Sequence, residues 1–337
     1  MTEFSINEFI KYINTKESYF LNRWGGSDIY ILGIFNYYYL KNYNTDKIMD
    51  YDDIEYYINY LSKYNGYYDT SNNKSERYNN LILFFNKIKD IYVSNEVNFD
   101  LLNFYHNEFG KYFNKNIYLD IKYISYHNIC ESTYFFSNII LELFKNKKIL
   151  IISPFCNLIK NQIPKLKYLY NKEINNEFVF LNTFITYFNE DDKIYTNIPH
   201  NNFHETVKHY EQEIDKLDFD IALISCGSYA YFIGEKIKTM NKKAFYIGGI
   251  LQLYFGLYGD GYLKKYFKWF DLNYCELNNF DIKYSFKTKE MCNTYIYNEN
   301  KHIHILNTFN YDYNKFDENN KELNYIGAKI NFLMKNL

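Results

Sequence analysis

The two stretches that decide the fold are KKILIISPF at residues 147–155 and DFDIALISCG at residues 218–227. Each is a short, continuous apolar run followed by a turn. Such a run is typical of a strand that is buried on both faces of a sheet. We therefore expect both stretches to be central strands.

Similar but shorter apolar runs occur elsewhere, and segments with helical spacing of apolar residues separate them. Strands that alternate with helices predict an α/β fold: a Rossmann-like, mainly parallel sheet flanked by helices. The further strand candidates are residues 19–21, 178–181 and 244–247, and the helix candidates are 157–170, 202–216 and 231–240.

The domain organisation follows from the length and from the scarcity of linker residues. The chain has 337 residues and three prolines, and no Pro/Gly/Ser-rich linker divides it. We expect a single domain over residues 1–337. Residues 36–115 are predicted to be a mostly helical insert, in which the polar stretch 69–77 forms an exposed loop, and residues 271–337 a C-terminal extension.

Charge and cysteine usage exclude several classes of function. The formal net charge is -2, so no basic face for nucleic acid is expected. The start has no secretory signal, and no run approaches the roughly 20 apolar residues of a membrane span. Five widely spaced cysteines without a CxxC pair indicate free thiols in a reducing compartment. We expect a cytoplasmic protein, with a homo-oligomer left open.

The high aromatic content reflects the base composition of the gene rather than a binding function. Aromatic residues make up 22% of the chain, including 41 Tyr. Together with many Asn, Lys and Ile residues, this composition is typical of an AT-rich genome. A tyrosine run such as residues 37–39 is therefore not interpreted as a sugar platform.

Candidate chemistry lies at the predicted strand ends, because parallel open sheets bind ligands beyond the carboxyl ends of their strands. In the first such stretch, NRWGGSD at residues 22–28, Gly25 and Gly26 let a ligand approach the backbone. Arg23 can pair with a phosphate through two hydrogen bonds, and Asp28 can hold a divalent cation that bridges a diphosphate. The alternative is a turn at the glycines followed by a helix that Ser27 or Asp28 caps.

Two more strand ends carry polar turns. Ser153 and Pro154 precede a helix that contains Lys160, and the helix start would favour an anion. Gly227, Ser228 and Tyr229 form a turn with a hydroxyl and a phenol. No GxSxG pattern surrounds them, which disfavours acyl transfer, and the preceding Cys226 is expected to be inert core.

The last strand end is the glycine-rich segment 248–259. Gly248 and Gly249 close a strand, and Gln252 is one polar residue in an apolar stretch before Gly256. A buried amide needs hydrogen-bond partners, which a base or a sugar could supply. The alternative is that the glycines only permit tight packing of a helix on the sheet.

The histidines give no metal-binding pattern. His200 and His204 are four residues apart and can share a helix face, and His302 and His304 can share a strand face. Neither pair has a third ligand at the spacing of a metal site. Both pairs are interpreted as surface or core residues.

In chain order, RWGGSD (23–28), ILIISPF (149–155), FDIALISCGSY (219–229) and GGILQLYFGLYG (248–259) resemble the motifs of GT-D-type glycosyltransferases. The first resembles the family's Arg-Phe-Gly-Asp-Gly-Glu-like motif. The resemblance covers residues 19–259 apart from much of the insert. In the family's first motif an Asp-x-Glu pair serves the metal and the diphosphate. Gly26 and Asp28 occupy these positions here, and Gly261-Tyr262 replaces the family's later basic-aromatic pair.

This resemblance implies a glycosyltransferase that moves a hexose from a UDP- or GDP-linked donor to a glycan or other hydroxyl acceptor. It implies a divalent metal, Mn²⁺ or Mg²⁺, at Asp28, with Arg23 and Asp28 as the catalytic residues. Glu131, Asp260 and Glu205 are the candidate bases. The residues predicted to bind the donor are Asn22, Gly25, Gly26, Ser153, Pro154, Gly227, Ser228, Tyr229, Gly248, Gly249, Gln252 and Gly256.

Two other hypotheses about the function stay open. The loss of the first carboxylate at Gly26 favours a non-catalytic relative that binds a nucleotide or a glycan. The glycine turns and Arg23 favour the enzyme. The other hypothesis is a structural scaffold of the same fold that binds no ligand.

Overall fold

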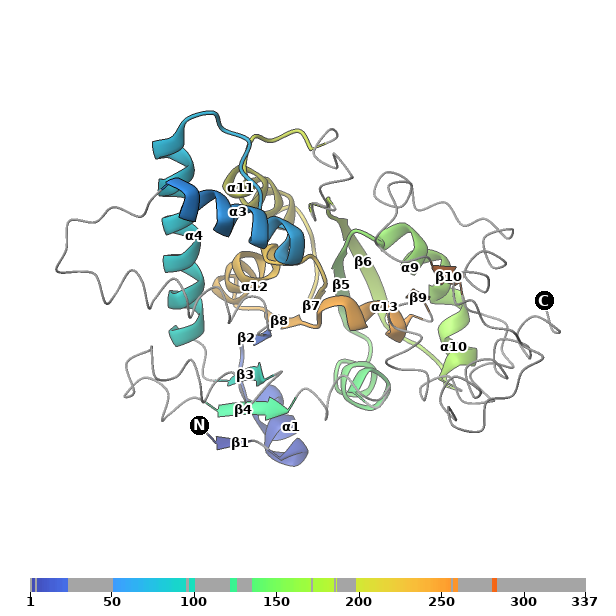
Figure 1. Cartoon of the computed structure of the whole chain (residues 1–337). Helices are drawn as coiled ribbons and strands as arrows, with labels where there is room; N and C mark the ends of the chain where they lie inside the picture. The colour runs from blue at the N-terminus through green and yellow to red at the C-terminus, as the bar shows by residue number, and fades with distance from the viewer. Residues whose placement is uncertain are drawn as a thin grey trace, which may run out of the picture.

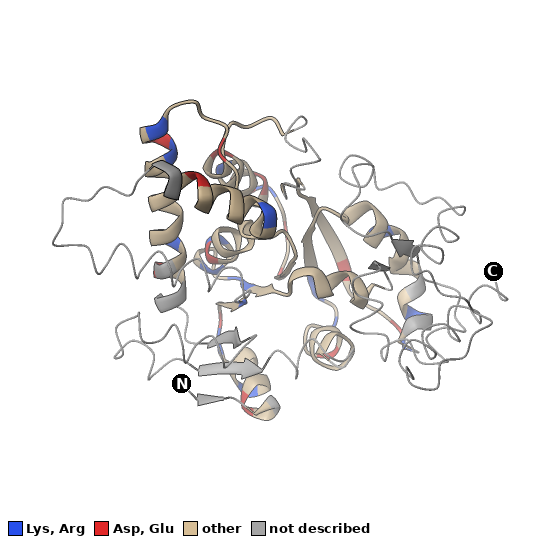
Figure 2. Ribbon diagram, in the orientation of Figure 1, with Lys and Arg blue, Asp and Glu red and all other residues tan. Residues whose placement is uncertain are grey.

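The computed structural model describes residues 2–3, 5–23, 51–94, 97–100, 122–125, 135–170, 172–184, 186, 198–255, 257–259 and 281–283. Within these ranges, no helix combines the length and the apolar character needed to cross a membrane. Basic and acidic residues are interspersed along the described elements rather than separated by sign (Figure 2).

An all-parallel sheet forms the centre of the molecule (Figure 1). Its strand order is β1-β4-β3-β2-β8-β7-β5-β6, and every neighbouring pair runs parallel. This arrangement confirms the predicted α/β, Rossmann-like fold. The strands are β1 (Thr2–Glu3), β2 (Tyr19–Arg23), β3 (Val97–Asp100), β4 (Lys122–Ser125), β5 (Lys148–Ser153), β6 (Glu177–Asn182), β7 (Ile221–Ile224) and β8 (Lys243–Tyr246).

Alternation along the strands builds one core on each face of the sheet. In β5, Ile149 and Ile151 belong to one core and Leu150 and Ile152 to the other, as the two-residue period of a strand requires. We call the two sides the α1 face and the α12 face. The α1 face is covered by α1 (Ile6–Thr15), the π-helix η1 (Phe135–Ile140), α8 (Leu141–Leu143), α9 (Cys156–Gln162), η2 (Ile163–Lys165), α10 (Leu166–Leu169), η4 (Gly248–Ile250) and α13 (Leu251–Tyr254).

The α12 face is covered by α3 (Tyr51–Asn65), α4 (Lys74–Ser94), α11 (Phe203–Ile214) and α12 (Tyr229–Thr239). Here α12 approaches β2 closely at Gly234. A Cβ on Gly234 would lie 2.1 Å from Cε2 of Phe20, so no larger residue fits without a shift of that ring. No local pattern in the sequence indicates this close contact.

The predicted elements differ from the structure in the insert. The long helices α3 and α4 lie there as expected, but β3 is a strand that joins the sheet between β2 and β4. The expected exposed loop over 69–77 is wrong at both ends. Asp69 is buried and accepts hydrogen bonds from Asn80 Nδ2 (2.8 Å) and Ser71 N (3.0 Å), and α4 already begins at Lys74.

Part of the predicted C-terminal extension is described. Residues Asp281–Lys283 form β10, which pairs in parallel with β9 (Leu257–Gly259) in a separate two-stranded sheet. The remaining residues of the extension lie outside the described ranges, and the domain boundaries stay a prediction.

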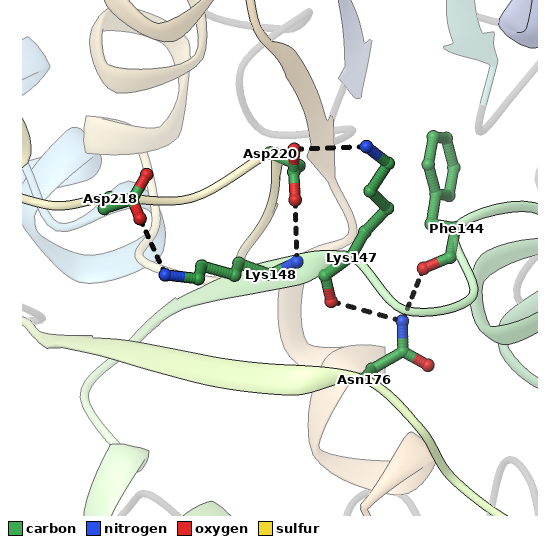
Figure 3. Close-up of polar contacts among 6 residues, drawn as sticks. All are labelled: Phe144, Lys147, Lys148, Asn176, Asp218 and Asp220. Carbon is green, nitrogen blue, oxygen red and sulfur yellow. Dashed lines mark hydrogen bonds and ion pairs between the residues drawn. The ribbon is translucent and has the colours of Figure 1, made fainter.

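Exposed polar groups connect the strands at the end of the sheet where β5 and β7 begin (Figure 3). The Asp220 carboxylate accepts a hydrogen bond from Lys148 N at 2.8 Å, and Lys148 Nζ donates to Asp218 at 2.7 Å. This bond raises the pKa of Lys148 and lowers that of Asp218. These contacts join β5 to the start of β7 and lie at the opposite edge from the predicted site.

Candidate functional site

The strand register brings the predicted site segments to one edge of the sheet. Leu21 pairs with Phe245, and Ile224 pairs with both Ile152 and Tyr246. The chain leaves β5 toward β6 on one side and leaves β7 toward β8 on the other. The β5–β7 boundary is therefore a topological switch point, the usual place for a ligand in such sheets.

At one end of this edge, Arg23 lies directly against Gly248. A Cβ on Gly248 would lie 1.6 Å from Nη1 of Arg23 and 2.8 Å from its Cζ, and the φ of Gly248 is 69°. The guanidinium carbon also lies 5.8 Å from the centroid of the Tyr246 ring. Two features therefore favour glycine at position 248: its backbone is left-handed, and the Arg23 side chain fills the space that a Cβ would need. A side chain from β2, not a helix, explains the glycine.

Asn22, one residue before Arg23, is fully buried with an unsatisfied amide. Within the described structure, neither Oδ1 nor Nδ2 of Asn22 has a hydrogen-bond partner. A buried polar group without a partner is destabilising by about 1–3 kcal/mol. The amide can both donate and accept, so a bound polar molecule at this strand end would satisfy it.

At the switch point, the Ser153 hydroxyl stabilises its own turn. Ser153 Oγ accepts a hydrogen bond from Phe155 N at 3.2 Å, next to the half-buried Pro154. Ser153 O accepts from Thr183 N at 3.3 Å, while the buried Thr183 hydroxyl has no partner among the described residues. Lys160 is exposed in the last turn of α9, away from the helix start.

The turn after β7 is partly closed by α3. Gly227 has a φ of 62°, and Ser228 N donates to the carbonyl of Asn65, the last residue of α3, at 2.9 Å. The Ser228 hydroxyl is buried without a partner among the described residues. Tyr229 lies in the α12-face core, with its ring 4.4 Å from that of Phe203, and burial raises its pKa.

Gln252 is buried in α13, beyond β8. The helix is held from the α1 face, where Phe136 stacks on Tyr254 at 5.1 Å and Tyr170 Oη donates to Tyr254 O at 2.6 Å. Gly249 is half-buried in η4. The structure therefore places Gln252 on a short helix at the same end of the sheet as Gly248.

Several predicted site residues lie outside the described ranges. They are Gly25, Gly26, Asp28 and Gly256 and the candidate bases Glu131 and Asp260. Gly261, Tyr262, His302 and His304, which were not predicted to belong to the site, lie outside the described ranges as well.

Among the described residues, no three His, Cys, Asp or Glu side chains gather in a way that could hold a metal ion. The third candidate base, Glu205, lies in the first turn of α11, whose N-cap is Asn202. Its Oε2 accepts from Asn201 N at 2.9 Å, and its N–H donates to Asn202 Oδ1 at 3.0 Å. This arrangement gives Glu205 a structural role.

The described histidines and cysteines are structural. His200 Nδ1 lies 3.0 Å from Thr206 Oγ1 and His204 Nε2 lies 2.8 Å from Asn80 O, so the two imidazoles have separate partners. Burial lowers the pKa of both histidines. Burial also raises the pKa of Cys156 to about 12 and that of Cys226 above its ordinary value. Neither thiol is an activated nucleophile, and Cys226 is buried as expected.

Sequence reasoning missed two features of this edge. Thr183 directly follows β6, and the same strand-end rule could have identified it. The contact of Asn65 with Ser228 joins residues far apart in the chain, and no local pattern indicates it. Comparisons with protein-family models, with curated proteins and with solved structures find no match to this chain.

Proposed function

We propose that the protein is a glycosyltransferase that transfers a sugar from a UDP- or GDP-linked donor to a glycan or other hydroxyl acceptor. The observation that carries the proposal is the carboxyl end of β2. There the guanidinium of Arg23 lies against a glycine that admits no side chain (Gly248), and the preceding residue, Asn22, is buried with no amide partner among the described residues. The parallel sheet supports it, since its carboxyl edge is where such folds bind nucleotides.

The residues have separate roles in this proposal. Arg23 presents a planar fork that can meet two oxygens of the donor diphosphate and stabilise the charge that develops on the leaving nucleotide. Asn22 hydrogen-bonds a polar group of the donor that carries both a donor and an acceptor. Asp28 is the proposed ligand of a divalent cation, which would also stabilise the leaving diphosphate. Among the residues that the structure describes, no group of three His, Cys, Asp or Glu side chains could hold this cation.

A non-catalytic nucleotide- or glycan-binding relative is the second candidate. Two observations favour it. The N–H of Ser228 already donates to the carbonyl of Asn65, and the Glu205 carboxylate already accepts a hydrogen bond from Asn201 N at the start of α11. Release of nucleoside diphosphate from the donor distinguishes the two candidates. An enzyme releases it with an acceptor or with water, and a binding protein leaves the donor intact.

The proposal is tested by thermal-shift measurements with UDP-glucose, UDP-N-acetylglucosamine, UDP-galactose, GDP-mannose and GDP-fucose, with and without Mn²⁺. A donor at about 100 times its dissociation constant should stabilise the protein by roughly 2.7 kcal/mol. Asp28→Asn should remove the part of this shift that depends on Mn²⁺, because the amide cannot replace the charged ligand. If no nucleotide sugar shifts the wild-type protein, the proposal is wrong.

A further inference from the structure

Two buried hydroxyls at the carboxyl ends of β6 and β7 make no hydrogen bond within the described structure. They are Thr183 Oγ1, directly after β6, and Ser228 Oγ, in the turn after β7. Thr183 is 4% exposed and Ser228 is 1% exposed. Buried polar side chains are ordinarily paired, because an unpaired one is destabilising. We call these two groups the hydroxyl pair.

Neither hydroxyl stabilises its own segment. Ser228 is the N-cap residue of α12, where a serine side chain ordinarily accepts a hydrogen bond from the first turn of the helix. Here the side chain makes no such bond. Thr183 continues the pairing of β6 with β5 through its N–H, which donates to Ser153 O at 3.3 Å, and its hydroxyl takes no part. The described fold therefore gives no structural reason for either hydroxyl.

The end of α3 contacts both segments that carry the pair. Asn65 O accepts a hydrogen bond from Ser228 N at 2.9 Å, and the carbonyl of the next residue, Gly66, accepts one from the Thr186 hydroxyl. Thr186 follows Thr183 by three residues. In the sheet, β5 lies between β6 and β7. The hydroxyl pair therefore flanks the carboxyl end of β5, at the switch point and beside the end of α3.

The surroundings of the pair favour a neutral ligand. The described residues at or directly after the ends of β5, β6 and β7, together with the two at the end of α3, are all uncharged: 153–155, 183–184, 225–228, Asn65 and Gly66. A hydroxyl can both donate and accept a hydrogen bond. A phosphate or a carboxylate instead binds most strongly to charged donors such as arginine. We therefore expect a polyhydroxy molecule here rather than an anion.

We infer that the hydroxyl pair binds the ring hydroxyls of a hexose. Adjacent strands lie about 4.8 Å apart, so Ser228 after β7 is one strand away from Gly248 after β8. Arg23 lies against Gly248, where the proposed function places the donor diphosphate. A hexose linked to that diphosphate would extend toward the pair. That this hexose is the transferred sugar rests on the proposed function; that a hexose binds here does not.

The experiment measures binding of free glucose, galactose, mannose, N-acetylglucosamine, fucose and ribose by ligand-observed NMR, which detects weakly bound single sugars. Ser228→Ala/Thr183→Val removes both hydroxyls and keeps similar side-chain shapes. Ser137→Ala/Thr15→Val makes the same two substitutions in η1 and α1, on the α1 face, and is the matched control. We expect at least one hexose to bind the wild type and the control equally, and the hydroxyl-pair variant at least roughly tenfold more weakly.

Urea unfolding without ligand separates binding from a structural role. A buried hydroxyl without a partner can be replaced by an apolar group of the same shape at no loss of stability. The unfolding midpoint of Ser228→Ala/Thr183→Val should therefore be no lower than that of the wild type. A lower midpoint would show that the hydroxyls stabilise the fold, and it would overturn the inference.

Three binding results would overturn it as well. They are no hexose bound by the wild type, equal binding by the hydroxyl-pair variant, and binding of ribose alone, which would assign the pair to the ribose of a nucleotide. Titrations with UDP-glucose and GDP-mannose keep the two proposals apart. If these donors bind the wild type and the variant equally and no free hexose binds, the transferase stands and the hydroxyl pair is refuted. Hexose binding that depends on the pair, in a protein that binds no nucleotide sugar, would support the pair and refute the transferase.

Discussion

At the scale of single residues, the pair Arg23 and Gly248 explains the glycine-rich stretch better than composition does. Gly248 has a left-handed φ and no room for a Cβ beneath the guanidinium. Glycines are conspicuous in a sequence, so the need for close approach at Gly248 could be predicted. That the approaching group comes from β2 could not, since β2 and β8 are more than two hundred residues apart.

Gly248→Ala should therefore disturb both the backbone and Arg23. A left-handed alanine is less stable by about 1–2 kcal/mol, and displacing the guanidinium adds to this. We expect a lower free energy of unfolding in urea and a weaker nucleotide-sugar thermal shift. For the unfolding measurement, Gly249→Ala, at the adjacent residue with an ordinary φ, is the control for backbone strain. Equal unfolding free energies for Gly248→Ala and the wild type would contradict the packing described here.

The histidines predict a pH dependence of stability. Burial is the largest cause of the lowered pKa of His200 and His204, so the folded state favours their neutral forms. Folded protein then binds fewer protons than unfolded protein between the lowered pKa and the ordinary value of about 6.5, and stability falls as the pH drops through this range. His204→Gln should reduce the loss of unfolding free energy between about pH 7.5 and pH 5.5. An unchanged slope would contradict this.

At the scale of elements, the short apolar runs predicted β5, β7 and β8, because the residues of these strands are buried. The helical spacing of apolar residues predicted α11 and α12, because those residues form the buried faces of the two helices. β3 was not predicted, since VNFD is short and half polar and joins the sheet only by long-range pairing. The contact of α3 with Ser228 could not be predicted from the sequence either, because it depends on the tertiary structure alone.

The packing of α12 on β2 gives a test at this scale. Gly234→Ala would raise helix propensity by about 1 kcal/mol, but its Cβ would lie 2.1 Å from Phe20 Cε2. Overpacking of this kind destabilises by about 1–3 kcal/mol, so we expect a net loss in urea unfolding. Phe20→Leu/Gly234→Ala should recover part of it. A Gly234→Ala variant more stable than the wild type would show that the helix does not lie this close.

At the scale of the whole molecule, the parallel sheet collects residues from distant parts of the chain at one edge. Arg23 at the end of β2, Ser153 at the end of β5 and Gly227 after β7 were predicted to lie at one edge together with Asp28 and Gln252, and the register places these three strand ends at the same edge. Asp28 lies outside the described residues, so the shared site stays a prediction. What the strand-end rule could not predict is the use of each group. The Ser153 hydroxyl stabilises a turn, Ser228 N donates to a carbonyl of α3, and the Asn22 amide has no partner among the described residues.

The central claim is that this edge binds a nucleotide sugar through Arg23. Isothermal titration of the wild type and Arg23→Lys with UDP- and GDP-sugars in the presence of Mn²⁺ tests it most directly. Lysine keeps the charge but not the fork that meets two phosphate oxygens, so we expect binding by the wild type and at least roughly tenfold weaker binding by Arg23→Lys. Equal affinities for the two proteins, or no binding by either, would contradict the account.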